Sequence, residues 1–191
     1  MLTAGGGVGV GFVGVTGLAG AGKTTAVGHL IKLTGGHGIY LGQTVLDEVR
    51  ARGLPETREN ERQVRIDLRQ KGPEALAIPY VDKVTECLEN GISVFVDAIL
   101  TQAEFDLLTS HVPSGSARLL AIEASFDVRS RRLKSRQERP LTPDELRKRD
   151  NTELERLGTR AVIESANCTI HNEETLGEFY RQLAAFVSCC G

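Results

Sequence analysis

Short apolar runs alternate with longer amphipathic stretches along this chain. The clearest apolar run, at residues 92–97, is rich in β-branched side chains and predicts a buried strand. Further strands are predicted at residues 11–16, 39–41, 117–123 and 168–171. The remaining amphipathic or charged stretches predict helices at residues 24–33, 44–53, 59–71, 73–88, 102–110, 127–136, 144–157 and 176–187. Strands and helices that alternate in this order predict an α/β fold with a mostly parallel sheet.

A glycine-rich segment joins the first strand to the first helix, and it matches the phosphate-loop pattern G-x-x-x-x-G-K-[ST] at residues 17–24. Glycines let successive backbone N–H groups point at phosphate, and the helix N-terminus adds positive charge. Lys23 should reach the β and γ phosphates, and the Thr24 hydroxyl should bind Mg²⁺. The other residues expected to contact the nucleotide are Gly17, Gly20, Ala21, Gly22 and Thr25. The alternative is a flexible turn without a ligand.

A second glycine pattern, G-x-G-x-x-G, precedes this loop at residues 9–14. A dinucleotide-binding fingerprint must follow a strand and open a helix, whereas Gly14 falls inside the predicted first strand. Because 14 of the 21 glycines lie in the first 42 residues, such a match carries little weight. We therefore predict a flexible Gly-rich arm at residues 1–10 and a single domain at residues 11–191.

Asp97 ends the clearest buried strand. In phosphate-loop proteins an acid at this place can hold the magnesium shell, and in small kinases it can orient or deprotonate the acceptor. We predict both metal-binding and catalytic roles for Asp97. The alternative is an aspartate that only caps the following turn.

Residues 129–149 carry seven arginines and two lysines. Arg129, Arg132 and Arg136 are spaced to share one helix face, where like charges repel unless an anion neutralises them. This pattern predicts a lid at about residues 136–148 that closes Arg132 and Arg136 over a triphosphate, with Arg139 as a further candidate. The alternatives are a solvated basic helix and a nucleic-acid surface, although no aromatic residue lies between Asp127 and Asp150 to stack on bases.

Composition narrows the function classes further. The net charge of −2 provides no global attraction to nucleic acid, so a nucleic-acid partner is not expected. The longest apolar runs are too short to span a membrane, and no basic residue precedes the first one as in a signal peptide. The four cysteines lack metal-binding spacing, so we interpret them as reduced thiols. These features predict a cytoplasmic protein, either a monomer or a homodimer.

Several motifs follow one another from residue 11 to the C-terminus, namely GVTGLAGAGKTT, LGQTVLDEVRARGLP, ENERQVRIDLRQKGPEALA, VFVDAIL, DVRSRRLKSRQ, RDNTELERLG and NCTIHNEETLGEF. Their order resembles the nucleoside monophosphate kinase superfamily, most closely its dephospho-CoA-kinase-like and nucleotide-kinase-like members. The resemblance implies a P-loop NTPase fold with a five-stranded parallel sheet, a helical acceptor region at about residues 42–90, a short lid, and ATP with Mg²⁺.

The resemblance also implies roles for single residues on the nucleotide side. Arg132 and Arg136 match the arginines at the base of the lid that contact adenine and phosphates. Asn172 falls in the loop that borders adenine, and Arg149 with Asp150 matches an arginine–acid pair beyond the lid.

The acceptor side departs from the pattern of these kinases. Leu46 and Leu100 stand where two arginines usually hold the acceptor phosphate, and losing two charge-assisted contacts would cost several kcal/mol for an anionic acceptor. The residues still expected to bind the acceptor are Gly42, Gln43, Arg65, Arg69 and Arg149.

The sequence therefore predicts an ATP-dependent phosphotransferase. Its acceptor would be a nucleotide-like or nucleoside-like small molecule, attacking through a phosphate or a hydroxyl. Two alternatives remain open at this point: a regulatory NTP-binding module with a degenerate acceptor site, and a kinase that acts on nucleic acid.

Overall fold

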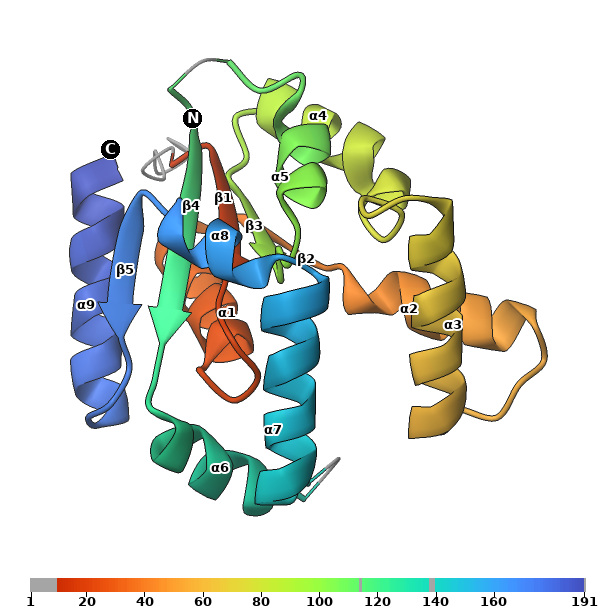
Figure 1. Cartoon of the computed structure of the whole chain (residues 1–191). Coiled ribbons are helices and arrows are strands. Elements are labelled where there is room, and N and C mark those ends of the chain that lie inside the picture. Colours follow the sequence, from red (N-terminus) through yellow and green to blue (C-terminus); the bar gives the residue numbers. More distant parts are fainter. Residues whose placement is uncertain (1–9, 114, 138–139, 191) are drawn as a thin grey trace.

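Five parallel strands form a single sheet in the computed structural model, which describes residues 10–113, 115–137 and 140–190 (Figure 1). The strand order is β2-β3-β1-β4-β5, and every pairing is parallel. This arrangement confirms the predicted α/β fold and all five predicted strands. The strands are β1 (Phe12–Thr16), β2 (His37–Tyr40), β3 (Val94–Asp97), β4 (Ala117–Glu123) and β5 (Cys168–His171).

Helices cover both faces of the sheet. Val13 and Phe95 pack toward α1 and α9 on one face, whereas their neighbours Phe12 and Val94 pack toward α4, α5 and α8 on the other. No helix in the described part of the chain has the length and apolar character needed to cross a membrane. The helices are α1 (Lys23–Thr34), α2 (Gly42–Ala51), α3 (Arg58–Lys71), α4 (Val81–Glu89), α5 (Gln102–Thr109), α6 (Phe126–Lys134), α7 (Pro143–Asn151), α8 (Thr159–Glu164) and α9 (Leu176–Cys190).

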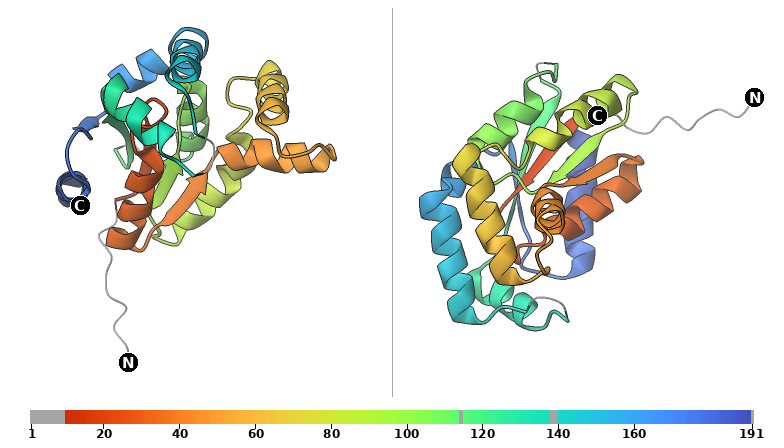
Figure 2. Two further views of the ribbon diagram at one scale, coloured as in Figure 1. Left: turned by 90° about the horizontal axis from the view of Figure 1, so that it is seen from below. Right: turned by 90° about the vertical axis from the view of Figure 1, so that its right-hand side faces the viewer.

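The pair α2 and α3 stands away from the sheet at the edge formed by β2 (Figure 2, left view). The two helices pack against each other through Val45, Val49, Val64 and Leu68, which join the main core on the α4 and α5 side. They belong to the predicted acceptor region. The division into a Gly-rich arm and one domain stays a prediction, and residues 1–9 of that arm lie outside the described residues.

Three helix predictions need correction. The helix expected from residue 73 begins only at Val81, after a short 3₁₀ turn (Ile78–Tyr80) that contains Pro79; proline lacks the N–H that a continuous helix would need there. The basic helix ends at Lys134, two residues early. The helix expected to run to residue 157 ends at Asn151 and continues as a π-helical turn (Thr152–Arg156), and α8 behind it was not predicted.

Candidate functional site

The loop between β1 and α1 has the backbone that a phosphate loop needs. Gly17, Gly20 and Gly22 have φ angles of 131°, 83° and 111°, which L side chains rarely adopt. A Cβ atom at Gly17 would lie 2.1 Å from the Ile122 carbonyl oxygen, and one at Gly22 would lie 2.5 Å from Nδ2 of Asn172. Only glycine fits these positions, and the loop follows a strand and opens a helix as predicted.

Lys23, the first residue of α1, folds back over this loop. Its Nζ donates hydrogen bonds to the carbonyl oxygens of Gly17 (2.7 Å) and Leu18 (3.0 Å). Burial lowers the pKa of Lys23, and the nearby carboxylates of Glu153 and Asp97 act in the opposite direction. The ammonium group is therefore held at the centre of the loop, next to two acids.

Thr24 and Asp97 come together although 73 residues separate them. Thr24 Oγ1 donates a hydrogen bond of 2.5 Å to Oδ2 of Asp97, which is only 4% exposed. The contact follows from the topology, because Asp97 at the end of β3 lies in register with Val15 on the adjacent β1. Both side chains offer hard oxygen atoms, as Mg²⁺ prefers. In the described part of the chain no three His, Cys, Asp or Glu side chains form a metal site, so a resident metal would also need phosphate and water ligands.

Asn172 and Arg132 brace the phosphate loop from outside. Asn172 Nδ2 donates a hydrogen bond of 2.8 Å to the carbonyl oxygen of Ala21, and its Oδ1 accepts one of 3.2 Å from Nη2 of Arg132. Burial lowers the pKa of Arg132, with the Glu173 carboxylate acting against it. Two residues that the sequence assigned to the nucleotide thus lie at the loop, and they connect it to β5 and α6.

The arginine cluster is divided differently from the sequence expectation. Arg129 is only 4% exposed and pairs with Asp150 through two hydrogen bonds, whereas Arg149 pairs with Glu153 at 2.7 Å. Arg149 and Asp150, which the resemblance matches to an arginine–acid motif, thus have different ion-pair partners. Arg129, Arg132 and Arg136 also do not share one helix face, because α6 ends at Lys134 and Arg136 lies exposed beyond it. Arg139 lies outside the described residues.

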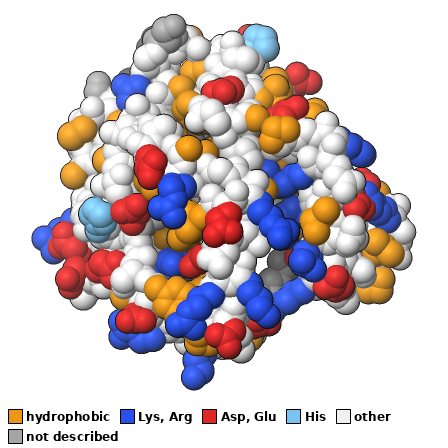
Figure 3. All heavy atoms as spheres, in the orientation of Figure 1, with side chains coloured by type: hydrophobic (Ala, Val, Ile, Leu, Met, Phe, Trp, Pro, Cys, Tyr) orange, Lys and Arg blue, Asp and Glu red, His pale blue; other side chains and the backbone are white. Residues whose placement is uncertain are grey.

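Two predicted acceptor residues, Arg65 and Arg149, lie near each other. Burial lowers the pKa of the Arg65 guanidinium, and the positive charge of Arg149 acts in the same direction. The neighbourhood includes Tyr40, whose ring lies so close to Gly42 that a Cβ there would come within 2.3 Å of it. Figure 3 shows Lys and Arg side chains gathered where the surface is hollowed between α7 and the α2–α3 pair.

Two further predicted acceptor residues, Arg69 and Gln43, bind other side chains of the chain, Arg69 in the interior and Gln43 at the surface. Arg69 Nη2 forms a 2.8 Å ion pair with Oε1 of Glu104, which is fully buried, so this arginine ties α3 to α5. Gln43 donates a hydrogen bond of 2.7 Å to Asp47 in the next turn of α2. Neither contact leads toward the phosphate loop.

Sequence reasoning missed Glu153. This residue is 5% exposed and lies in the π-helical turn after α7. Among the nearby charges, its carboxylate has the strongest effect on the pKa of Lys23, which it raises. The four-residue spacing from Arg149 to Glu153 was the available signal, but such spacing is common on helix surfaces.

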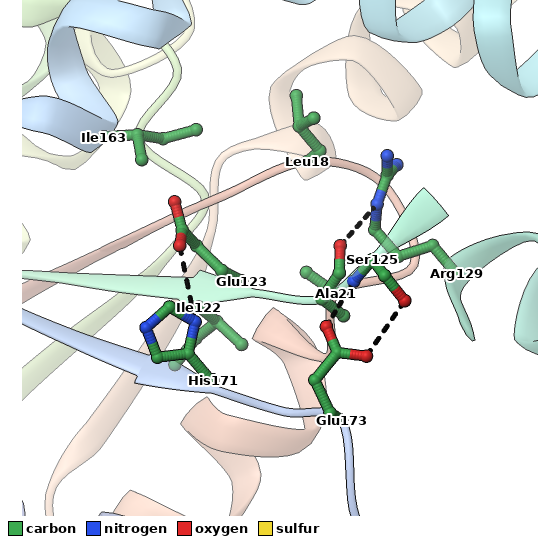
Figure 4. A pocket seen from close by; sticks show the side chains of 10 residues that line it. Leu18, Ala21, Ile122, Glu123, Ser125, Arg129, Ile163, His171 and Glu173 are labelled. Atoms are coloured by element: carbon green, nitrogen blue, oxygen red, sulfur yellow. Dashed lines mark hydrogen bonds and ion pairs between the residues drawn. The ribbon is translucent and has the colours of Figure 1, made fainter. Parts of the chain in front are cut away.

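A cavity of about 270 Å³ adjoins the loop where β4 and β5 end (Figure 4). Leu18 and Ala21 form its loop side, and Glu123 and His171 lie 3.5 Å apart in its lining. Glu173 closes another side by accepting hydrogen bonds from the N–H and hydroxyl of Ser125. The cavity thus lies at the carboxyl ends of parallel strands, where open α/β sheets bind ligands.

The sheet order and the phosphate loop define the class of this chain as a P-loop protein with a kinase-like fold. Residues 13–158 match a sequence family described as "AAA domain". The chain is 31% identical over 186 residues to a UPF0200 protein of Methanoculleus marisnigri, covering 94% of this chain and 96% of that protein. It is 34% identical over 173 residues to a UPF0200 protein of Methanoregula boonei, covering 87% and 90%. The chain therefore belongs to the UPF0200 family, and it carries an AAA-type domain.

Solved structures with the same fold include small-molecule kinases. A gluconokinase from Sinorhizobium meliloti superposes with a TM-score of 0.58 and 19% identity, covering 94% of this chain and 92% of that one. A shikimate kinase from Acinetobacter baumannii in complex with shikimate gives 0.58 and 16%, covering 94% and 93%. At such low identity the likeness concerns the fold. A closer placement among nucleoside monophosphate or dephospho-CoA kinases stays a prediction.

Proposed function

We propose that this protein transfers the γ-phosphoryl group of ATP to a nucleotide-like or nucleoside-like small molecule. The observation that carries the proposal is the contact of Thr24 with Asp97 beside Lys23, since it joins the metal-binding and phosphate-binding groups of a kinase at one point. Thr24 and Asp97 would hold Mg²⁺, which supplies positive charge to the phosphates when bound. Lys23 would leave its carbonyl partners to contact the β and γ phosphates.

The remaining groups have complementary roles in this proposal. Backbone N–H groups of residues 20–25 contact the phosphates, and Arg132 and Arg136 close over them from the lid side. The cavity beside Ala21 holds the nucleoside part of ATP, with Asn172 at its border. Gly42, Arg65 and Arg149 line the acceptor side. Arg69 and Gln43 have internal partners and support this side indirectly.

The test is acceptor-dependent ADP formation by the purified protein with Mg²⁺. The panel contains nucleosides, nucleoside monophosphates, dephospho-CoA, sugars and hydroxy acids. We expect at least one acceptor to raise ADP formation well above the rate with ATP alone. A protein that binds ATP, shows only slow hydrolysis and responds to none of these acceptors would favour a regulatory nucleotide-binding module and contradict the proposal.

A further inference from the structure

Glu153 is a buried carboxylate with one oxygen unused. Its Oε1 accepts the hydrogen bond from Nε of Arg149. Its Oε2 is shielded from solvent and has no hydrogen-bond partner within the described ranges. A buried carboxylate oxygen without a donor costs free energy, so the native protein keeps it there only if something else compensates. A donor supplied by a ligand is such a compensation.

The position of Glu153 connects it with the reacting groups. The carboxylate charges of Glu153 and Asp97 both act on Lys23, which places Glu153 in the neighbourhood of the phosphate loop. The π-helical turn Thr152–Arg156 brings it there, and turns of this kind are frequent at functional sites. Arg149, which orients the carboxylate, also lies near Arg65 on the acceptor side. Glu153 thus stands between the phosphate site and the acceptor side.

The two acids at this point have different partners. Asp97 already accepts the hydrogen bond of Thr24, with which it would hold Mg²⁺ in the proposed function. Glu153 accepts from Arg149 through Oε1, and its Oε2 has no hydrogen-bond partner among the described residues. An ionised carboxylate oxygen repels a phosphate group but attracts the hydrogen of a neutral hydroxyl.

We propose that Oε2 of Glu153 accepts the hydrogen bond of an attacking hydroxyl group, so that the phosphoryl acceptor is an alcohol and not a phosphate monoester. This inference rests on the proposed kinase function. The hydroxyl oxygen bonds to the γ-phosphorus of ATP while the bond from that phosphorus to the β–γ bridging oxygen breaks, and ADP leaves. The hydroxyl proton passes to Glu153 and then to water. The proposal requires that Oε2, which is buried in this structure, becomes accessible when the substrates bind.

The first experiment identifies the attacking atom. The protein is incubated with ATP and Mg²⁺ and either an alcohol panel (nucleosides, sugars, hydroxy acids) or nucleoside monophosphates, and ³¹P NMR separates phosphate esters from phosphoanhydrides. We expect an ester with a member of the alcohol panel. Formation of a phosphoanhydride alone would overturn the inference and leave the kinase function standing. Binding of ATP without transfer to either panel would overturn both proposals.

The second experiment tests Glu153 itself. In the E153Q variant, the amide oxygen can still accept from Arg149, but the side chain can no longer take a proton. We expect kcat to fall about 10²–10⁴-fold, with the ATP Kd and Tm close to those of the wild type. The matched control is E155Q, since Glu155 lies exposed in the same turn. The E153D variant should recover part of the lost kcat.

A purely structural role for Glu153 gives a different result. Tm and the ATP Kd would then shift in E153Q, and kcat measured on the folded fraction would stay near the wild-type value. That outcome, or equal kcat in E153Q and E155Q, would overturn the inference. Recovery of kcat in E153D without a change in Tm supports it.

Discussion

Arg129 holds the carboxylate of Asp150 with both terminal nitrogens of its guanidinium, at 2.9 and 2.8 Å. The same side chain donates to the carbonyl oxygen of Ala19 in the phosphate loop at 3.1 Å. One buried arginine therefore joins α6, α7 and the loop. Such planar, two-pronged pairs fix geometry as well as charge, so the shape of the loop depends on α7.

Replacing Asp150 by alanine should be strongly destabilising. Arg129 would stay buried without its partner charge, and breaking a buried pair in this way costs about 3–5 kcal/mol. Urea unfolding measures the change, and nucleotide affinity should fall with it because the support of Ala19 is disturbed. The control is E86A, which removes an exposed pair with Lys83 and should change stability little. Equal stability of D150A and E86A would contradict the assignment.

Two glycines near the start of α1 provide a matched comparison. In G22A, the new Cβ would lie 2.5 Å from Nδ2 of Asn172 at a φ of 111°, so the loop and its brace cannot both persist. We expect a loss of nucleotide binding and of stability. In G28A, the new Cβ would have no neighbour from the rest of the described chain within 4 Å. Replacing this helical glycine should raise the free energy of unfolding by about 0.5–1 kcal/mol. Thermal melts with and without ATP measure the stability and the ATP binding of each variant. Normal ATP binding by G22A would contradict the proposed loop geometry.

The K23A variant should lose transfer while remaining folded. Lys23 contributes a positive charge and two hydrogen bonds to carbonyl oxygens of its own loop, so these hydrogen-bond contacts are local. Removal of one preorganised group that faces the developing charge costs at least about 10²-fold in kcat. Circular dichroism and ADP formation separate the two effects. K32A, exposed on the same helix, should retain full turnover.

The stabilisation that Glu145 provides at the start of α7 should be lost in acid. Hydrogen bonds from the Thr142 N–H and hydroxyl lower the pKa of Glu145, and the charge of Arg58 adds to this. Because these bonds favour the ionised form, the stabilisation is present above the ordinary glutamate range and is lost as pH falls through the lowered pKa. The unfolding free energy of E145A should therefore be lower than that of the wild type at neutral pH, and the two values should converge in acid. A difference independent of pH would contradict this.

The sheet could be predicted because each strand carries its own apolar pattern. The run at residues 92–97 has buried neighbours on both faces, so its sequence alone marks it. The helix expected from residue 73 failed for a local reason, since apolar Ala75, Leu76 and Ala77 are buried in a turn and mimic helical spacing. Helix α8, which was not predicted from the sequence, is short. Gly158 at its N-cap reads in the sequence as the end of a helix and not as the start of a new one.

The site could be predicted where it follows the chain locally. Lys23 and Thr24 belong to a motif, and Asp97 ends a strand that neighbours the loop. Arg129 and Glu153 could not be assigned, because pairing decides their roles: Arg129 reaches Asp150 across 21 residues, and Glu153 enters the site through a π-helical turn. The ion pair of Arg69 could not be predicted either, since its partner Glu104 lies 35 residues away on α5.

The Thr24 hydroxyl provides a direct test of the metal site. T24V keeps the shape of the side chain but removes the oxygen that contacts Asp97 at 2.5 Å, so the proposed Mg²⁺ shell loses one ligand. We expect at least about 10-fold more Mg²⁺ to be needed for half-maximal turnover, by analogy with changes around metal ligands, and T24S should restore the wild-type midpoint. T169V, an exposed position on β5, is the control. If T24V and T169V titrate with the same Mg²⁺ midpoint, Thr24 is not a ligand, and Asp97 must hold the metal without it.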